Sequence, residues 1–276
     1  MHEDAAVNAK RQKFVNYLTG LLPLLQNNFQ HSGDPLLQKL ANPEYTDYLL
    51  PFRQRAPTME LAMITIYSDP DELRTPVGLF NALCFRGVFY GSSWARKRLR
   101  WFDSYNDWIG YHKLLGREDS HFVNLTCYGS CQVSRELSNI EIYWQKCNTW
   151  PTFLGPSNST PSLENIYKYL LSFHNIGKLS ALLLIGDFIE SRVIEMPSAK
   201  CWGEFVGMVD MGALKGLQNL GLLKSKASST DVQIAFTGLH DYIMNTISQD
   251  DLELMGYNVV MLEHGLCKLN RVGHLL

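Results

Sequence analysis

Apolar residues recur every three or four positions along most of this chain, which is the spacing of amphipathic helices. The first such segment is 7–29, where one side of the expected helix carries Phe14, Tyr17, Leu18, Leu21 and Leu25. Gly33 and a series of prolines interrupt the segment 30–75, so we expect short helices and loops there. A new helix is expected at Pro76, because proline suits the first helical turn.

The same periodicity predicts the remaining helices, which span 98–115, 132–146, 163–173, 179–189, 232–247 and 249–271. The stretch 121–129 (HFVNLTCYG) fits either a strand or an irregular bend. No second segment alternates clearly with period two, so a strand there would have no partner. We therefore predict an all-α fold.

Two polar segments are expected to be loops. The segment 148–162 is rich in Pro, Ser, Thr and Asn, and it ends with Thr160 as a helix N-cap before Pro161. The second loop is 224–231 (KSKASSTD). Both separate segments with strong helical periodicity.

Composition limits the functions to consider. The chain has 276 residues and a net charge of −2, so nucleic-acid binding would need a local basic patch. One candidate is the run 94–102, in which aromatic residues surround Arg96, Lys97, Arg98 and Arg100. This run suits phosphate contact with stacking nearby, and it also fits a solvated helix face. No apolar run is long enough to cross a membrane, so we expect an intracellular protein without a membrane partner.

A helical hairpin is the clearest candidate for chemistry. The polar turn His174-Asn175-Ile176-Gly177 lies between two apolar helical patterns and is followed by Lys178. Such a turn places backbone N–H groups, a helix N-terminus and a lysine at one point, which together favour an anion. A plain corner between packed helices explains the same residues equally well.

The stretch LENIYKYLLSFHNIGKLSALLLIGDF resembles the helix-hairpin-helix element of the DNA glycosylase superfamily. Three blocks together resemble the alpha-glutamyl/putrescinyl-thymine pyrophosphorylase family, which comprises amino acid:DNA transferases of thymine-hypermodifying phages and some fungi. The blocks are PVGLFNALCFRGVF, the hairpin with Asp187 and the downstream glycines of MVDMGALKGLQNL, and LEHGLC at 262–267. They span residues 76–272. After Cys267, however, the family's acidic residue and Asp-Lys pair are replaced by KLNR.

This resemblance implies a fold and a reaction. The fold would be a two-lobed helix-hairpin-helix DNA glycosylase-like domain over 76–276, with a loop near 148–162 and an N-terminal helical extension over 1–75. An amine, either an amino acid or a polyamine, would displace pyrophosphate from 5-pyrophosphomethyluracil in double-stranded DNA, at a base flipped out of the duplex. A phage-encoded protein would act in the host cytoplasm, and a fungal one in the nucleus.

The resemblance also implies roles for particular residues. Asp187, His264 and Arg86 would be catalytic, the first two as general bases or amine-orienting groups and the arginine at the pyrophosphate. DNA-binding residues would be Asn175, Gly177, Lys178, Arg96, Arg98 and Arg100. Substrate-binding residues would be Asn81, Gly212, Lys215 and Arg271. No metal site or resident cofactor is expected, and whether a divalent metal assists pyrophosphate departure is left open.

Two of these residues also fit purely structural roles. Asp187 fits a helix cap or a salt-bridge partner, and His264 fits a hydrogen-bonded core histidine. The aspartate that base-excising glycosylases use about twenty residues after the hairpin is replaced by EMPS at 195–198, so simple excision is less expected than altered chemistry. A divergent DNA glycosylase and a non-catalytic DNA-binding protein are the two alternative functions.

Overall fold

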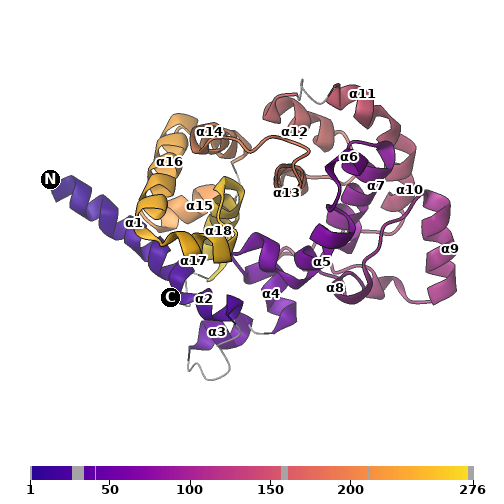
Figure 1. The fold of residues 1–276 in the computed structure, drawn as a ribbon, viewed down its shortest axis with the longest axis horizontal. Coiled ribbons are helices and arrows are strands. Elements are labelled where there is room, and N and C mark those ends of the chain that lie inside the picture. Colours follow the sequence, from indigo (N-terminus) through magenta and orange to yellow (C-terminus); the bar gives the residue numbers. More distant parts are fainter. Residues whose placement is uncertain (1, 27–33, 41, 157–160, 211, 273–276) are drawn as a thin grey trace. The chain divides into compact units, whose positions relative to one another are not determined.

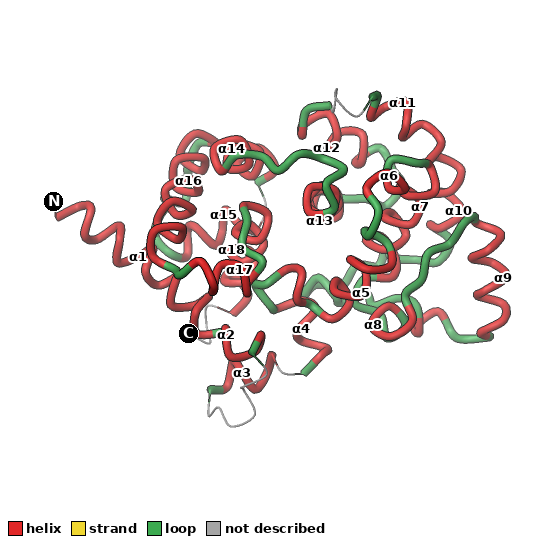
Figure 2. Tube along the Cα trace, in the orientation of Figure 1, coloured by secondary structure: helices red, strands yellow, loops and turns green. Residues whose placement is uncertain are grey.

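Every regular element that the structure describes is a helix (Figures 1 and 2). In this computed structural model, the described residues are 2–26, 34–40, 42–156, 161–210 and 212–272. The predicted all-α class is confirmed. The segment 121–129 contains the end of a short 3-10 helix and irregular turns, so it is a bend.

The chain divides into two units. One combines Met1–Ala56 with Pro197–Leu276, and the other is the continuous segment Pro57–Met196. This division differs from the expected boundary at residue 75, because the first helices associate with the C-terminal ones. A Cβ built at Gly265 in the last helix would lie only 3.2 Å from the ring of Phe14 in the first.

Ten short or medium helices belong to the discontinuous unit in the described residues. They are α1 (His2–Gly20), α2 (Leu22–Leu25), α3 (Pro35–Leu40), α4 (Pro43–Leu49), η1 (Arg53–Arg55), α14 (Ala199–Val209), α15 (Gly212–Asn219), α16 (Ser229–Thr246), α17 (Gln249–Met255) and α18 (Val259–Val272). The apolar side predicted for the first helix is confirmed at Phe14, Tyr17, Leu18 and Leu21, which are all buried. That helix ends at Gly20, however, and a new turn begins before Pro23. Positions 27–29 of the prediction lie outside the described residues.

Glycines allow two helix pairs of this unit to approach closely. Gly212 and Gly216 of α15 face α18, where a Cβ on either would collide with Cys267 or with the backbone carbonyl of Leu266. Gly203 of α14 faces Phe236 of α16 in the same way, at 3.2 Å. Backbones this close leave no room for side chains between them.

The continuous unit contains the remaining helices. They are α5 (Pro57–Thr65), α6 (Pro70–Leu73), α7 (Pro76–Cys84), the π-helical turn η2 (Phe85–Phe89), α8 (Ala95–Arg98), α9 (Tyr105–Leu115), η3 (Asp119–His121), α10 (Asn139–Lys146), η4 (Cys147–Thr149), α11 (Trp150–Leu154), α12 (Leu163–Leu171) and α13 (Lys178–Glu190). Helix α7 begins as expected, with the Thr75 side chain accepting from Gly78 N at 3.1 Å. Stacked and edge-on aromatic rings, including Phe89, Trp94 and Phe102, fill part of the core.

Several predicted boundaries are wrong, and side-chain contacts explain them. The segment 98–115 is not one helix, because the Asn81 amide pairs with the backbone of Phe102 and holds that residue outside a helix. Residues 132–138 are turns, because Arg135 points inward to backbone carbonyls of the preceding segment. The segment 249–271 breaks at Gly256, which has a φ of 63°.

The predicted loop 148–162 also contains helical structure. Helix α11 lies within it, and Trp150 anchors that helix by donating its ring N–H to the Leu73 carbonyl at 2.9 Å. The N-cap of α12 is Ser162, whose hydroxyl accepts from Asn165 N at 3.3 Å. The N-cap predicted at Thr160 lies outside the described residues. The second predicted loop, 224–231, ends in a capping box between Ser228 and Asp231.

Candidate functional site

The predicted helical hairpin is present in the continuous unit. Helix α12 enters a short turn, and α13 leaves it at Lys178. Phe173 and Ile176 are buried and anchor the turn in the core, whereas Asn175, Gly177 and Lys178 are exposed. The residues expected to meet phosphate therefore lie on the solvent side of the turn.

Polar contacts hold this turn in a defined conformation. Asn175 adopts a left-handed backbone conformation with a φ of 58°, which asparagine tolerates better than most residues. Its side-chain nitrogen donates to Oδ1 of Asn139 at 3.0 Å. Lys146 Nζ donates to the carbonyl oxygen of Ser172 at 2.6 Å. The hairpin is thus fastened at two points to helix α10.

The start of α13 suits an anion. Gly177 is the N-cap, and a Cβ built there would meet no atom within 4 Å. The first N–H groups of a helix have no intrahelical acceptor, and the helix dipole is positive at this end. Lys178 adds a full positive charge at the same place. A phosphate oxygen is therefore able to approach the backbone closely here.

Arg86 and Asp187, both predicted to be catalytic, form a buried ion pair. Arg86 Nε lies 2.5 Å from Asp187 Oδ2, and Arg86 Nη2 lies 2.6 Å from Oδ1. The side chains are 2% and 0% exposed. The hydroxyl of Tyr67 donates to Oδ2 at 2.8 Å. Both carboxylate oxygens are therefore engaged by donors from other parts of the unit.

Arg86 lies on the π-helical turn η2. Such turns are uncommon and often occur where a side chain must be redirected at a functional site. The Tyr128 hydroxyl donates to the Arg86 carbonyl at 2.9 Å, and the guanidinium lies 4.6 Å from the centre of the Tyr90 ring. Its Nη2 also contacts Sδ of Met59 at 3.0 Å. This environment fixes both the backbone and the side chain of the arginine.

This ion pair joins helix α13, which carries Asp187, to the turn η2, which carries Arg86. Burial alone would lower the pKa of Arg86, but the Asp187 carboxylate outweighs it and holds that pKa above its ordinary value. A carboxylate that receives two hydrogen bonds from an arginine is strongly favoured in its charged form. The geometry therefore suits Asp187 to positioning Arg86 better than to accepting a proton.

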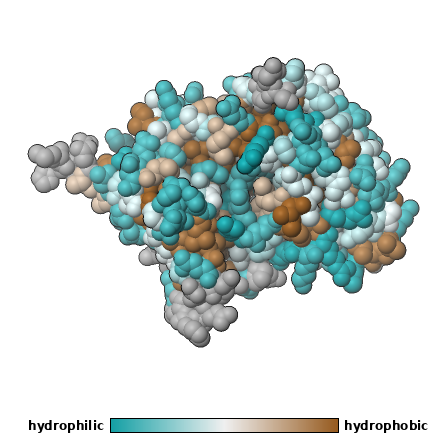
Figure 3. All heavy atoms as spheres, viewed as in Figure 1, coloured by the Kyte–Doolittle hydropathy of each residue, from teal (hydrophilic) through white to brown (hydrophobic). Residues whose placement is uncertain are grey.

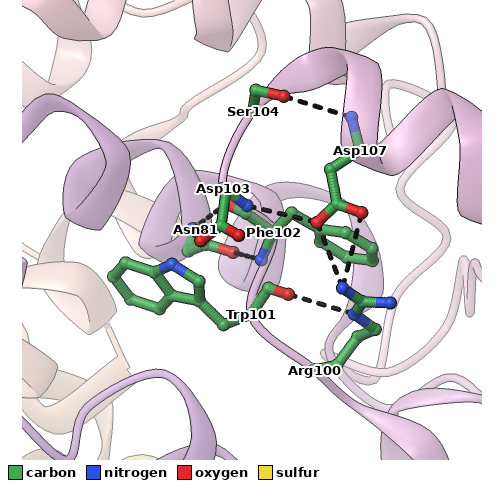
Figure 4. Close-up of polar contacts among 7 residues, drawn as sticks. All are labelled: Asn81, Arg100, Trp101, Phe102, Asp103, Ser104 and Asp107. Carbon is green, nitrogen blue, oxygen red and sulfur yellow. Dashed lines mark hydrogen bonds and ion pairs between the residues drawn. The ribbon is translucent and has the colours of Figure 1, made fainter.

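The predicted basic run ends in an ordered loop, shown in Figure 4. Arg100 Nη2 lies 3.1 Å from Asp107 Oδ2, and its guanidinium lies 5.1 Å from the ring centres of both Phe102 and Tyr111. Arg100 thus has an acidic partner and two aromatic neighbours. Arg98, in contrast, is exposed at the end of α8, and Arg96 is half-buried.

Asn81 holds the same loop from inside. Its Nδ2 donates to the carbonyl oxygen of Phe102, and its Oδ1 accepts from Phe102 N at 2.9 Å (Figure 4). The same Nδ2 also donates to the carbonyl oxygen of Val77. The residue is 2% exposed. Both amide donors are therefore used inside the protein, and the substrate-binding role predicted for Asn81 stays a prediction.

The remaining predicted residues lie in the discontinuous unit. On α18, His264 and Lys268 are buried, and Arg271 is half-buried. Lys268 Nζ and Arg271 Nη1 both donate to the carbonyl oxygen of Tyr48, at 2.7 and 3.2 Å. The helix thus carries several ionisable groups in an interior position, which is the environment in which pKa values shift most.

Helix α15 contributes Gly212 and Lys215. Lys215 is exposed, and Gly212 lies where a Cβ would collide with Sγ of Cys267. The position of Gly212 thus has a packing explanation that is sufficient without a ligand. The predicted catalytic and binding residues fall into two sets, one in each unit, and within the continuous unit the structure brings Arg86 and Asp187 into direct contact.

Glu263 is expected to make stability depend on pH. Burial raises its pKa to about 7, against the opposing attraction of Arg53, Lys268 and Arg271. Because the folded state binds this proton more tightly, stability is highest below the ordinary carboxyl pKa and falls as pH rises toward about 7. Glu263→Gln removes the ionisation, so at pH 8 we expect a gain of about 3 kcal/mol in the free energy of unfolding.

Urea unfolding of both proteins at pH 4.5 and pH 8 measures this difference. The gain should almost disappear at the lower pH, where Glu263 is protonated in the folded state and about half protonated in the unfolded chain. Equal midpoints at pH 8 would show that Glu263 is not neutral in the fold near pH 7.

Sequence reasoning missed the residues that support these sites. Tyr67 and Tyr128, which contact the ion pair and the Arg86 backbone, are separated from it by many positions. Arg135 is buried, donates to the carbonyls of Val88 and Tyr90, and contacts Cys127 Sγ. No periodic signal distinguishes such residues, because their partners become neighbours only in the folded unit.

Comparisons with protein-family models, with curated proteins and with solved structures found no match. Among the described residues, no three His, Cys, Asp or Glu side chains are grouped so as to hold a metal ion. The described helices also include none that is long and apolar enough to cross a membrane. Function is therefore inferred from the geometry of these residues and from the sequence resemblance.

Proposed function

We propose that this protein is a DNA-modifying transferase that acts on 5-pyrophosphomethyluracil in double-stranded DNA. In the proposal it uses the helix-hairpin-helix scaffold of the DNA glycosylases, with the two units as its lobes. The hairpin is the observation that supports this proposal most strongly. Its buried anchors, exposed Gly177 and exposed Lys178 form an ordered turn with free space beside the helix N-terminus.

This hairpin would position the DNA and leave the choice of base to other residues. Contacts from backbone N–H groups and lysine to phosphate oxygens hold a duplex without reading its sequence. The modified base would then be flipped out of the helical stack into a pocket, which is how many enzymes that act on DNA bases enclose the reacting atoms.

The reaction requires one substitution step. The amine nitrogen forms a bond to the exocyclic carbon as the bond from that carbon to the pyrophosphate oxygen breaks, and the amine loses one proton. We assign the proton to His264, because Asp187 is committed to Arg86. Arg86 and Asp187 thus become positioning residues that hold α13 against η2. The amine donor is an amino acid or a polyamine.

A non-catalytic DNA-binding protein is the second candidate. The observation that favours it is the closed Arg86–Asp187 pair, which is fully buried and satisfied without a substrate. A divergent glycosylase, the third candidate, would leave abasic sites in modified DNA. These candidates share the hairpin and differ in the product, so binding and product are measured separately.

Replacement of the N-cap tests the hairpin without disturbing the fold. Gly177 has the extended backbone of an N-cap, with φ −85° and ψ 178°, so Gly177→Asp should keep or slightly raise stability. Its carboxylate would occupy the free N–H groups and repel phosphate. We expect duplex affinity to fall at least about tenfold, because two or more charge-assisted contacts are lost.

Fluorescence anisotropy with a labelled duplex at several salt concentrations measures this effect. Lys178→Gln should reduce the slope of log affinity against log salt by about 1. Lys168→Gln is the matched control, because Lys168 is an exposed lysine of α12 that already pairs with Glu164 at 2.6 Å. If Gly177→Asp bound the duplex with unchanged affinity and had the same thermal stability, the hairpin would not be a DNA-binding element.

A further inference from the structure

Lys146 is fixed at the point where the hairpin turn begins. It is the last residue of α10, and its Nζ donates to the carbonyl oxygen of Ser172 at 2.6 Å. The same ammonium lies 5.4 Å from the centre of the Phe173 ring. Ser172 is the C-cap of α12, and the last carbonyl groups of a helix have no intrahelical donor. Two contacts therefore hold the charge of Lys146 beside the turn.

The contact with Ser172 uses only part of the hydrogen-bonding capacity of Lys146. A lysine ammonium has three N–H donors, and one of them points to the Ser172 carbonyl. The residue is exposed, and within the described part of the chain it has no acidic partner. Lys168 on the neighbouring helix differs, because it pairs with Glu164. Two donors and most of the charge of Lys146 are thus open to an oxygen from outside the protein.

Capping of α12 is one role of this lysine, because a cation is favourable at the C-terminal end of a helix. The turn does not depend on that cap alone. Nδ2 of Asn175 donates to Oδ1 of Asn139 at 3.0 Å, and Nδ2 of the buried Asn139 donates to the Ser134 carbonyl at 2.8 Å. The charge of Lys146 can therefore be removed while the turn stays in place.

Lys146 and Lys178 lie at opposite ends of one compact turn. Ile176 N donates to the Phe173 carbonyl at 3.2 Å, which closes the turn between them. Ser172 and Lys178 are six residues apart, so their backbones are separated by at most about 22 Å. Phosphates recur about every 3.4 Å of helix axis along one DNA strand. A strand with a phosphate at the start of α13 therefore offers other phosphates along the length of the turn.

We propose that Lys146 binds a second phosphate of the DNA strand that the hairpin holds, with its ammonium shared between the Ser172 carbonyl and a phosphate oxygen. This inference rests on the proposed function. An ammonium is a compact charge with rotatable donors, which suits single oxygens on two different partners. The chain's net charge of −2 gives no general attraction to DNA, so affinity depends on local contacts of this kind.

The surface of the turn also favours a charged partner over an apolar one. Ser172, His174 and Asn175 are exposed there. Among the described residues of the two hairpin helices, Leu171 is the one large apolar side chain that is exposed, at 36%. Hydrophilic residues likewise cover most of the face in Figure 3, and its apolar areas are scattered. A phosphate backbone is therefore a better match to this surface than an apolar partner.

The test is the affinity of the full chain for a labelled duplex at several salt concentrations. Lys146→Gln keeps a side-chain donor for Ser172 and removes the charge, so it should keep the thermal stability of the wild type and reduce the salt slope by about 1. Lys146→Arg should retain the wild-type slope. The double variant Lys146→Gln/Lys178→Gln should lose about 2 from the slope, because the two residues meet different phosphates. Lys168→Gln is again the control and should leave the slope unchanged.

The outcomes separate this inference from the proposed function. If Lys178→Gln reduced the salt slope and Lys146→Gln did not, Lys146 would be a cap of α12 alone and the inference would be wrong. A weaker affinity of Lys146→Gln with the same slope would also overturn it, because the lysine would then act only through the shape of the turn. A loss of only about 1 in the double variant would exclude a separate phosphate. If the wild type bound no duplex at all, the proposed function and this inference would fail together.

Discussion

Asp187→Asn should lower the free energy of unfolding by about 3 to 5 kcal/mol, because it leaves the Arg86 guanidinium buried without its counter-charge. Asparagine has nearly the same volume, so the loss is electrostatic and does not arise from a cavity. Urea unfolding followed by tryptophan fluorescence measures the effect well. Five of the protein's six tryptophans, all except Trp202, belong to the same unit as this pair.

The double variant Arg86→Met/Asp187→Leu is the control. It removes both charges and keeps apolar volume, so it should be more stable than Asp187→Asn and recover most of the loss. If Asp187→Asn unfolded at the wild-type urea concentration, the pair would not be a buried ion pair in solution. The unfolding measurement is also needed to interpret activity assays of these variants, because a variant that unfolds loses activity whether or not the residue is catalytic.

Gly216→Ala should destabilise the protein by about 3 kcal/mol through the contact between α15 and α18. The added methyl group would collide with the backbone carbonyl of Leu266, which is not able to move without displacing the helix. Gly20→Ala is a suitable control in the same unit, because a Cβ at the end of α1 meets no atom within 4 Å. Its effect should stay within about 0.5 kcal/mol.

Thermal unfolding by circular dichroism compares the two substitutions. If Gly216→Ala were as stable as the wild type, α15 and α18 would lie farther apart in solution than they do in the structure. Gly212 lies one turn earlier, beside Cys267. If only Gly216→Ala loses stability, the close approach of α15 and α18 also explains the glycine at position 212.

Local patterns were sufficient to predict the helical class and the hairpin. The spacing of Leu163, Ile166 and Leu170 predicted α12, and the proline after Thr75 predicted the start of α7. These signals work because periodicity and N-caps depend on residues that are near one another in sequence. Local signals did not decide between a strand and a bend at 121–129, because a strand is identified through a partner that is distant in sequence.

Long-range contacts account for what the sequence did not predict. The interruption of the expected helix 98–115 depends on Asn81, and that of 132–146 depends on the inward Arg135. The pairing of Arg86 with Asp187 joins residues 101 positions apart, although each was singled out separately. The division into units likewise depends on contacts between the two ends of the chain.

The measurement that tests the central claim most directly is mass spectrometry of nucleosides after the protein acts on DNA that contains 5-pyrophosphomethyluracil. Amines are supplied as a mixture of amino acids and polyamines, and released pyrophosphate is measured in parallel. The proposed function predicts one new nucleoside whose mass corresponds to replacement of pyrophosphate by one amine, formed in equal amount with free pyrophosphate. His264→Gln should retain duplex binding and lose this product. Tight, hairpin-dependent duplex binding with no new nucleoside from any amine would contradict the transferase and leave a DNA-binding protein.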